Sequence, residues 1–244
     1  MRLSVTTLAL LCALALAPFP SAAGDARGLT VVELFTSQGC SSCPPADAFL
    51  GELAEKEGLL ALSFHVDYWD YIGWKDIFAD PAFTRRQREY ASNLGLRYVY
   101  TPQMVIQGSV HVTGSDRPAV FERIERFKST DRVPVTLGRD ASGRLAVSIA
   151  QASEQTEAAV WMVVYDDAHA TKVRRGENRG RTLIDRNVVR GLRRIGTWTG
   201  KAMSLKVELS GITMDPGDGC AVILQSIATG HVLGAAKLAL DKSG

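Results

Sequence analysis

The sequence lacks most of the motifs that mark common catalytic and metal-binding sites. It has no glycine-rich phosphate loop, no Ser-His-Asp signature and no HExxH motif. Its four cysteines include one CxxC pair, and no second CxxC or CxxH completes a set of zinc ligands, so a structural zinc site is not expected. A net charge of +2 is too small to indicate a nucleic-acid partner by its field alone. These absences leave the CxxC pair as the main chemical feature.

Long apolar runs are also missing. The run Leu8 to Ala17 is shorter than the roughly 20 residues that a membrane-spanning helix needs. Arg2 precedes it and the small residues Ser21-Ala22-Ala23 follow it, which is the pattern of a Sec-type signal peptide. A retained N-terminal anchor is the alternative. We expect residues 1–23 to be removed, leaving a periplasmic or secreted protein without stable membrane insertion.

Removal of this segment takes Cys12 with it and leaves three cysteines. In an oxidising compartment the close pair, Cys40 and Cys43, can persist as a disulfide. Three is an odd number, so one thiol is expected to be free. We predict that this is Cys220, a small buried side chain in a strand.

The CxxC lies between a predicted strand and a predicted helix. Val31 to Phe35 is a short run of apolar and β-favouring residues, typical of a buried strand. Beyond Pro45, apolar residues fall on one face of a helix: Ala46, Phe49, Leu50, Leu53 and Ala54. The N-terminal end of a helix stabilises a thiolate through its free N–H groups and its dipole.

Two prolines locate the start of this helix. Pro44 and Pro45 lack an N–H, which the first helical turn does not use. Ser41 or Ser42 is then the expected N-cap, leaving Cys40 accessible just outside the helix and Cys43 inside its first turn. Alternatively, the prolines kink a helix that begins earlier.

The CxxC spacing favours redox chemistry. It is the shortest at which one cysteine can attack a substrate disulfide and the next can resolve the mixed disulfide. A structural or vestigial disulfide and a metal site are the other interpretations of the pair.

The remaining pattern predicts two regions. Up to about residue 128 the predicted order is β-α-β-α-β-β-α, beginning with the strand and helix on either side of the CxxC. The further strands are expected at Leu59–Val66, Gln103–Gln107 and Val110–Thr113, and the further helices start at Pro81 and span Arg117–Lys128. Beyond Thr130 only strands are predicted, at Val133–Leu137, Leu145–Ala150, Ala158–Tyr165, Met203–Leu209, Cys220–Ala228 and Val232–Leu240.

The first region resembles the thioredoxin fold in its element order, its CxxC and the Thr101-Pro102 that opens its third strand. More narrowly, the stretches VELFTSQGCSSCPPAD, HVDYWDYIGWKD, FTRRQREYA and YTPQMVIQG resemble a bacterial family of secreted thioredoxin-like proteins catalogued as a domain of unknown function. Gly176 to Arg190 resembles the C-terminal part of the same family. The expected architecture is an α/β thioredoxin-like domain (24–131) followed by an all-β, antiparallel, sandwich-like domain (132–244).

The resemblance implies roles for particular residues. Cys40 would be the attacking thiol, Cys43 the resolving thiol and Pro102 a cis-proline against the pair. Glu33, on the strand before the cysteines, would accept the proton of Cys43 if it is buried, with a solvated edge position as the alternative.

The same resemblance indicates where a substrate would bind. Thr101 would offer its backbone to a peptide, and Gly39 stands where thioredoxin has a tryptophan. With Trp69, these are the predicted substrate contacts. The expected function is thiol–disulfide exchange with protein or small thiol substrates and no cofactor. A binding module with a structural disulfide is one alternative, and a copper-delivery protein that uses His65 is the other.

Two further groups of residues have more than one interpretation. The aromatic stretch Tyr68 to Phe78 either faces a bound peptide or packs in the core. The arginines between residues 174 and 194 either bind an anionic ligand or partner, or form a solvated strand face with ion pairs to Glu177 and Asp185, or contact the thioredoxin-like domain.

Overall fold

The computed structural model describes residues 28–152, 156–208, 212 and 217–240. The predicted signal peptide lies outside these residues. Within them, no helix combines the length and the apolar content needed to cross a membrane.

Strands dominate the described chain. In order, the elements are β1 (Thr30–Thr36), α1 (Pro44–Ala54), β2 (Leu59–His65), the 3-10 helix η1 (Asp70–Ile72), α2 (Pro81–Asn93), β3 (Gln103–Ile106), β4 (Val110–Thr113), α3 (Arg117–Lys128), β5 (Val135–Arg139), β6 (Leu145–Ile149), β7 (Ala158–Lys172), β8 (Thr182–Trp198), β9 (Met203–Val207), β10 (Gly219–Ser226) and β11 (Val232–Ala239).

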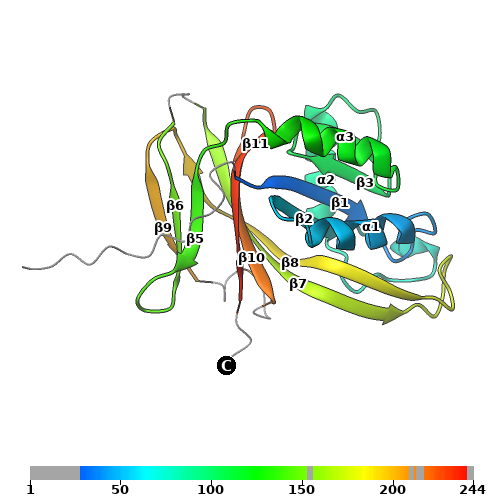
Figure 1. Cartoon of the computed structure of the whole chain (residues 1–244). Coiled ribbons are helices and arrows are strands. Elements are labelled where there is room, and N and C mark those ends of the chain that lie inside the picture. Colours follow the sequence, from blue (N-terminus) through cyan, green and yellow to red (C-terminus); the bar gives the residue numbers. More distant parts are fainter. Residues whose placement is uncertain (1–27, 153–155, 209–211, 213–216, 241–244) are drawn as a thin grey trace, which may run out of the picture.

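One mixed sheet of eight strands crosses the molecule in the order β11-β10-β7-β8-β2-β1-β3-β4 (Figure 1). β1 is parallel to β2 and antiparallel to β3. β8 joins this group by a parallel pairing of Val188 with Ser63 of β2. The predicted fold class is therefore wrong: there is no separate α/β domain followed by an all-β domain, because strands from both regions form a single sheet.

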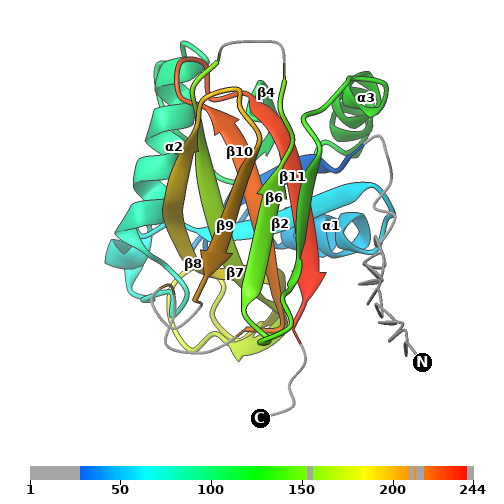
Figure 2. The same cartoon turned by 90° about the vertical axis from the view of Figure 1, so that its left-hand side faces the viewer.

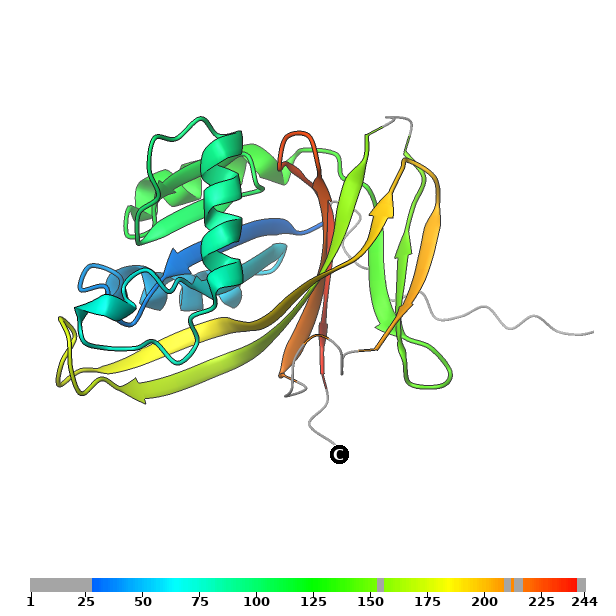
Figure 3. The same ribbon diagram turned by 180° about the vertical axis from the view of Figure 1, so that it is seen from behind.

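A shared hydrophobic core explains this arrangement. Phe35 and Phe64, from β1 and β2, pack in one cluster with Tyr90 of α2, Val163 of β7 and Ile223 of β10. Figure 3 shows α2 crossing this face of the sheet. Burial of these side chains requires both regions of the chain, so neither region closes its core alone.

Two other layers cover the remaining faces. α1 and α3 pack against Val32 and Leu34, on the opposite face of β1. The second sheet, β5-β6-β9, covers β7, β10 and β11 and contributes to a separate cluster around Trp198 (Figure 2). Cys220 is free and buried in β10, as predicted.

The β7–β8 hairpin extends well beyond the shared core. Its pairing continues to Lys172 and Thr182, and its turn lies at the end of the sheet where β1 leads into the cysteines (Figure 1). β8 was not among the predicted strands, because charged and apolar residues mix on both of its faces. We refer to the turn, Val173–Arg181, as the hairpin tip.

Candidate functional site

Cys40 and Cys43 form a disulfide at the N-terminal end of α1, with their Cα atoms 5.4 Å apart. Pro44 and Pro45 occupy the first turn, as predicted, but the N-cap is Cys43 itself, without a side-chain hydrogen bond. The prediction of a serine N-cap is therefore wrong. Because Cys43 caps the helix, its carbonyl accepts from the N–H of Asp47 at 3.1 Å, which puts Asp47 one turn further along the same helix face.

Both cysteines are buried: Cys40 is 2% exposed and Cys43 is 0% exposed. The expectation that Cys40 is accessible is wrong, because the hairpin tip covers it. The buried Asn178 donates from Nδ2 to the carbonyl oxygens of Gln38 and Cys40, both at 2.9 Å. Glu177 accepts from the N–H of Ser41 at 3.3 Å. The disulfide thus lies beneath a turn that is far away in the sequence, since Asn178 follows Cys40 by 138 residues.

Gln38 connects the loop before the cysteines to three other segments. Its amide donates to Asp185 of β8 at 2.9 Å, and its side-chain oxygen accepts from the Trp74 indole at 3.1 Å. Its backbone N–H donates to Asp76 at 2.8 Å. These three hydrogen bonds satisfy polar groups of the buried Gln38, and they tie the loop before Cys40 to its surroundings.

Three carboxyl groups and one imidazole lie buried behind the disulfide: Asp47, Asp76, Asp185 and His65. His65 Nδ1 is 2.7 Å from Asp76 Oδ2. Burial opposes a charged imidazole, but the charge and hydrogen bond of Asp76, together with Asp185 and Asp47, raise the pKa of His65 to about 9. For Asp76, the contacts with His65 and two backbone N–H groups outweigh burial and lower its pKa.

Asp47 is the member of this group on the cysteine-bearing helix. The Thr36 hydroxyl donates to its Oδ1 at 2.6 Å. Burial, reinforced by the charge of Asp185, raises the pKa of Asp47 to about 7, although the Thr36 hydrogen bond and His65 act in the other direction. This carboxyl group therefore exchanges its proton close to neutral pH.

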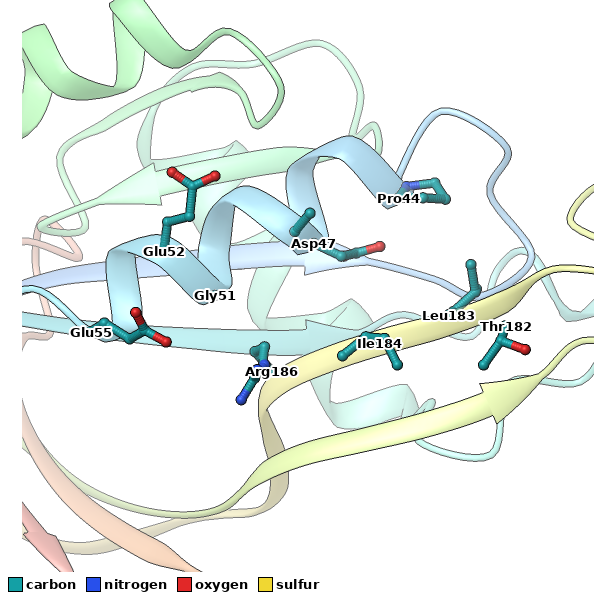
Figure 4. A pocket seen from close by; sticks show the side chains of 10 residues that line it. Pro44, Asp47, Gly51, Glu52, Glu55, Thr182, Leu183, Ile184 and Arg186 are labelled. Atoms are coloured by element: carbon teal, nitrogen blue, oxygen red, sulfur yellow. The ribbon is translucent and has the colours of Figure 1, made fainter.

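A groove of about 410 Å³ reaches Asp47 from the surface between α1 and β8 (Figure 4). It is lined by Pro44, Asp47, Ala48, Gly51, Glu52, Glu55, Thr182, Leu183, Ile184 and Arg186. Asp47 is 7% exposed, and the groove gives it a route to solvent from beneath the disulfide.

The structure does not bring Glu33 to the cysteines. Its side chain lies on the α2 face of β1, whereas α1 packs on the other face. Arg86 donates to both of its carboxylate oxygens, at 2.6 and 2.8 Å, and the Tyr90 hydroxyl donates to Oε1 at 2.8 Å. Glu33 is buried, so the alternative of a solvated edge position is wrong, and its partners are Arg86 and Tyr90.

The other predicted residues lie at the same end of the sheet. Gln103 pairs with Phe35, so Thr101 and Pro102 lie at the edge where β1 leads to the cysteines, and the bond between them is cis. The Trp69 indole donates to the Thr101 hydroxyl at 2.7 Å. A Cβ on Gly39 would lie 3.2 Å from Cβ of Trp69, so only a small residue fits there. Gly39, Trp69 and Thr101 thus form one wall beside the disulfide loop.

The Nδ1 atom of His65 is engaged by Asp76, and the two cysteines are bonded to each other. Its buried Nε2 has no hydrogen-bond partner. Among the described residues, no group of three or more His, Cys, Asp and Glu side chains is placed to hold a metal ion.

Sequence reasoning missed Asp47 and Asn178. Helical spacing could have indicated the first, because Asp47 shares a face with Cys43 and Leu50. No local pattern indicates that Asn178 contacts a loop 138 residues earlier in the chain.

Comparisons with known proteins found a family and two structures. The family model described as "Protein of unknown function (DUF1223)" matches residues 31–225. A crystal structure of protein AGR_C_4864 from Agrobacterium tumefaciens is 33% identical, with a TM-score of 0.76 over 88% of this chain and 96% of that chain. HBP35 of Porphyromonas gingivalis is 14% identical, with a TM-score of 0.56 over 90% of this chain and 77% of that chain, a likeness of fold alone. No curated protein matched.

Proposed function

The chain belongs to the DUF1223 family of proteins of unknown function, and we propose that it is an exported thiol–disulfide oxidoreductase acting through Cys40 and Cys43 on protein or small thiol substrates. The observation that carries the proposal is the pairing of this disulfide with Asp47, a buried carboxyl group one helical turn away whose pKa is raised to about 7. A thiol that must lose its proton near neutral pH needs such an acceptor.

Three features support the proposal: the first two indicate a thioredoxin-like site, and the third indicates export. The elements from β1 to α3 follow the order β-α-β-α-β-β-α, with the CxxC after the first strand. A cis-proline opens β3. The N-terminal residues have the pattern of a signal peptide, and the compartment that it leads to sustains disulfides.

Cys40, Cys43 and Asp47 each take part in one step of the proposed reaction. In the reduced protein, the Cys40 thiolate attacks a substrate disulfide, forming a mixed disulfide and releasing one substrate thiolate, which takes up a proton. Cys43 then transfers its proton to Asp47 and attacks the Cys40 sulfur. This closes the Cys40–Cys43 bond and releases the second substrate thiolate, which is also protonated. The two cysteines give two electrons to the substrate. Its two protons come from Cys43, by way of Asp47, and from the solvent, into which Cys40 released its proton when the thiolate formed. With a dithiol substrate the same steps run in reverse.

Access to Cys40 requires displacement of the hairpin tip. The tip is held to the cysteine loop by the two Asn178 hydrogen bonds and the Glu177 contact, at least one of which must break. Each such bond contributes only about 1 kcal/mol net, so opening is a modest local event.

The test is to trap a mixed disulfide. A Cys43→Ser variant should accumulate mixed disulfides through Cys40, because the resolving thiol is absent. These adducts are detected by mass spectrometry in the periplasmic or secreted fraction of cells. Cys220→Ser is the matched control, since it removes the buried thiol that is not part of the pair and should trap nothing. The proposal would be contradicted if no adduct forms and if the Cys40–Cys43 disulfide is too stable to be reduced by any redox couple of the compartment to which the protein is exported.

A second function is favoured by the burial of both cysteines. The fold could serve as a binding module in which the disulfide only ties the start of α1 to the preceding loop. In that case Cys40→Ser would lower the free energy of unfolding, by about 2–4 kcal/mol for a typical disulfide, and leave partner binding intact.

A further inference from the structure

The hairpin tip concentrates positive charge beside the disulfide. The eight residues Arg174 to Arg181 contain four arginines and one glutamate, a net charge of +3, whereas the whole chain carries +2. The rest of the chain is therefore net negative by one charge. The positive charge of the tip is therefore local, because the rest of the protein is not basic.

These arginines point to solvent and are not neutralised. Arg174, Arg175, Arg179 and Arg181 are all exposed. Arg181 donates to Asn178 Oδ1 at 3.2 Å, and in the part of the chain that the structure describes none of the four forms an ion pair. Elsewhere on the surface, arginines such as Arg117 and Arg126 face a carboxylate. The expected ion pairs to Glu177 and Asp185 do not form, because Glu177 contacts Ser41 and Asp185 contacts Gln38.

Hydrogen bonds and packing hold the backbone of the tip beside the cysteine loop. The backbone N–H of Val173 donates to the carbonyl oxygen of Arg181 at 3.0 Å, and the N–H of Gly180 donates to the carbonyl oxygen of Val173 at 2.9 Å. A Cβ on Gly176 would lie 3.2 Å from Cβ of Trp74, so the tip rests on the aromatic loop after β2. Asn178, at the centre of the tip, contacts Cys40 directly. The backbone segment that carries the four arginines is therefore held beside the Cys40 backbone.

We propose that the hairpin tip is a docking surface for acidic polypeptide segments, and that the substrates of the Cys40–Cys43 pair carry Asp or Glu residues close to their reacting cysteines. The inference rests on the proposed function for the identity of the reacting group. A polypeptide is favoured over other anions because the basic surface adjoins a disulfide, and because Tyr71, 81% exposed, lies on the same aromatic loop and offers apolar contact to a peptide.

The main experiment compares two peptide disulfides with the same reactive centre. One has four glutamates flanking its cysteine and the other has four lysines. Stopped-flow measurements with the reduced protein give the second-order rate constant for each. We expect the acidic peptide to react at least about tenfold faster at low salt, because electrostatic steering raises association rates by about 10 to 1000-fold. The preference should shrink towards unity at 1 M salt, where the Debye length is about 3 Å.

Charge-matched variants locate the effect. The triple variant Arg174→Gln, Arg175→Gln, Arg179→Gln should lose most of the preference. The control triple Arg139→Gln, Lys201→Gln, Lys206→Gln removes the same charge near the β5-β6-β9 sheet, far from the tip, and should keep it (Figure 1). Equal rates for the two peptides, or equal losses in the two triple variants, would overturn the proposal.

Two further measurements separate this proposal from the proposed function. A small neutral disulfide should react equally with the wild-type protein and both triple variants, and failure to react at all contradicts the oxidoreductase assignment alone. Anisotropy with a cysteine-free acidic peptide tests the docking surface without any redox step. Binding to anionic vesicles but not to this peptide would identify the tip as a lipid-binding surface and contradict the inference.

Discussion

Two buried charged clusters lie on opposite faces of β1, and they differ in their balance of charge. On the α2 face, Glu33 is paired with Arg86, and Tyr90 and Gln225 complete the hydrogen bonds of the two groups. On the α1 face, three carboxyl groups, Asp47, Asp76 and Asp185, surround His65. A matched pair keeps its charges and acts as structure. In the acid-rich cluster, burial and the neighbouring carboxylates raise the pKa of Asp47 to about 7 and also raise the pKa of Asp185. Such shifts are typical of functional sites.

Breaking the balanced cluster should have the largest effect on stability. Glu33→Gln leaves the buried Arg86 without its counter-charge, which typically costs about 3–5 kcal/mol. We expect a loss of this size in the free energy of unfolding, measured in urea. The matched control is Glu52→Gln, which removes the partner of Arg117 from an exposed ion pair and should change stability little. A small effect of Glu33→Gln would mean that the two clusters do not differ as described.

Relieving the acid excess should stabilise the protein, but only at higher pH. The folded pKa of Asp47 is raised from 3.8 to about 7, so its contribution is favourable below pH 4 and is lost as the pH rises towards and through 7. Asp47→Asn keeps an acceptor for Thr36 and removes the charge. We expect it to raise the free energy of unfolding at pH 8 by on the order of 2–4 kcal/mol, and to change it little at pH 4.

Glu55→Gln is the control for this prediction, since Glu55 lies on the same helix and groove but is exposed. A stabilisation by Asp47→Asn of equal size at both pH values would exclude titration of Asp47 as its cause. In the reduced protein, the same variant should slow closure of the disulfide and flatten its dependence on pH between 6 and 8.

Weakening the contact between the hairpin tip and the cysteine loop should have the smallest effect on stability. It should clearly increase the access of a reductant to the disulfide. Asn178→Ala removes two hydrogen bonds to the cysteine loop, a loss of about 1–2 kcal/mol. Because about 1.4 kcal/mol corresponds to a factor of ten, reduction of the Cys40–Cys43 bond by a small phosphine should become roughly tenfold faster. Arg179→Ala, an exposed position in the same turn, should leave this rate unchanged. Equal rates in both variants would show that Asn178 does not control access.

Sequence reasoning worked where the determinants are local. The prolines after Cys43 locate the start of α1, and the helix predicted over Arg117–Lys128 is α3 with the same bounds. Predicting Glu33 as the proton acceptor failed because its face of β1 was not known. Alternation along a strand says which residues share a face, but not which helix covers that face.

The sequence by itself determined the strand-to-helix position of the cysteine pair, the free buried Cys220 and most of the strands, because each depends on neighbours within a few residues. Only the tertiary structure decided that one sheet joins both regions, that Asp47 lies with Asp76, Asp185 and His65 behind the disulfide, and that the hairpin tip covers Cys40. The pairing of Ser63 with Val188 and the contact of Asn178 with Cys40 join residues more than 100 positions apart. Such contacts follow from how the whole chain buries its apolar surface, which no local pattern encodes.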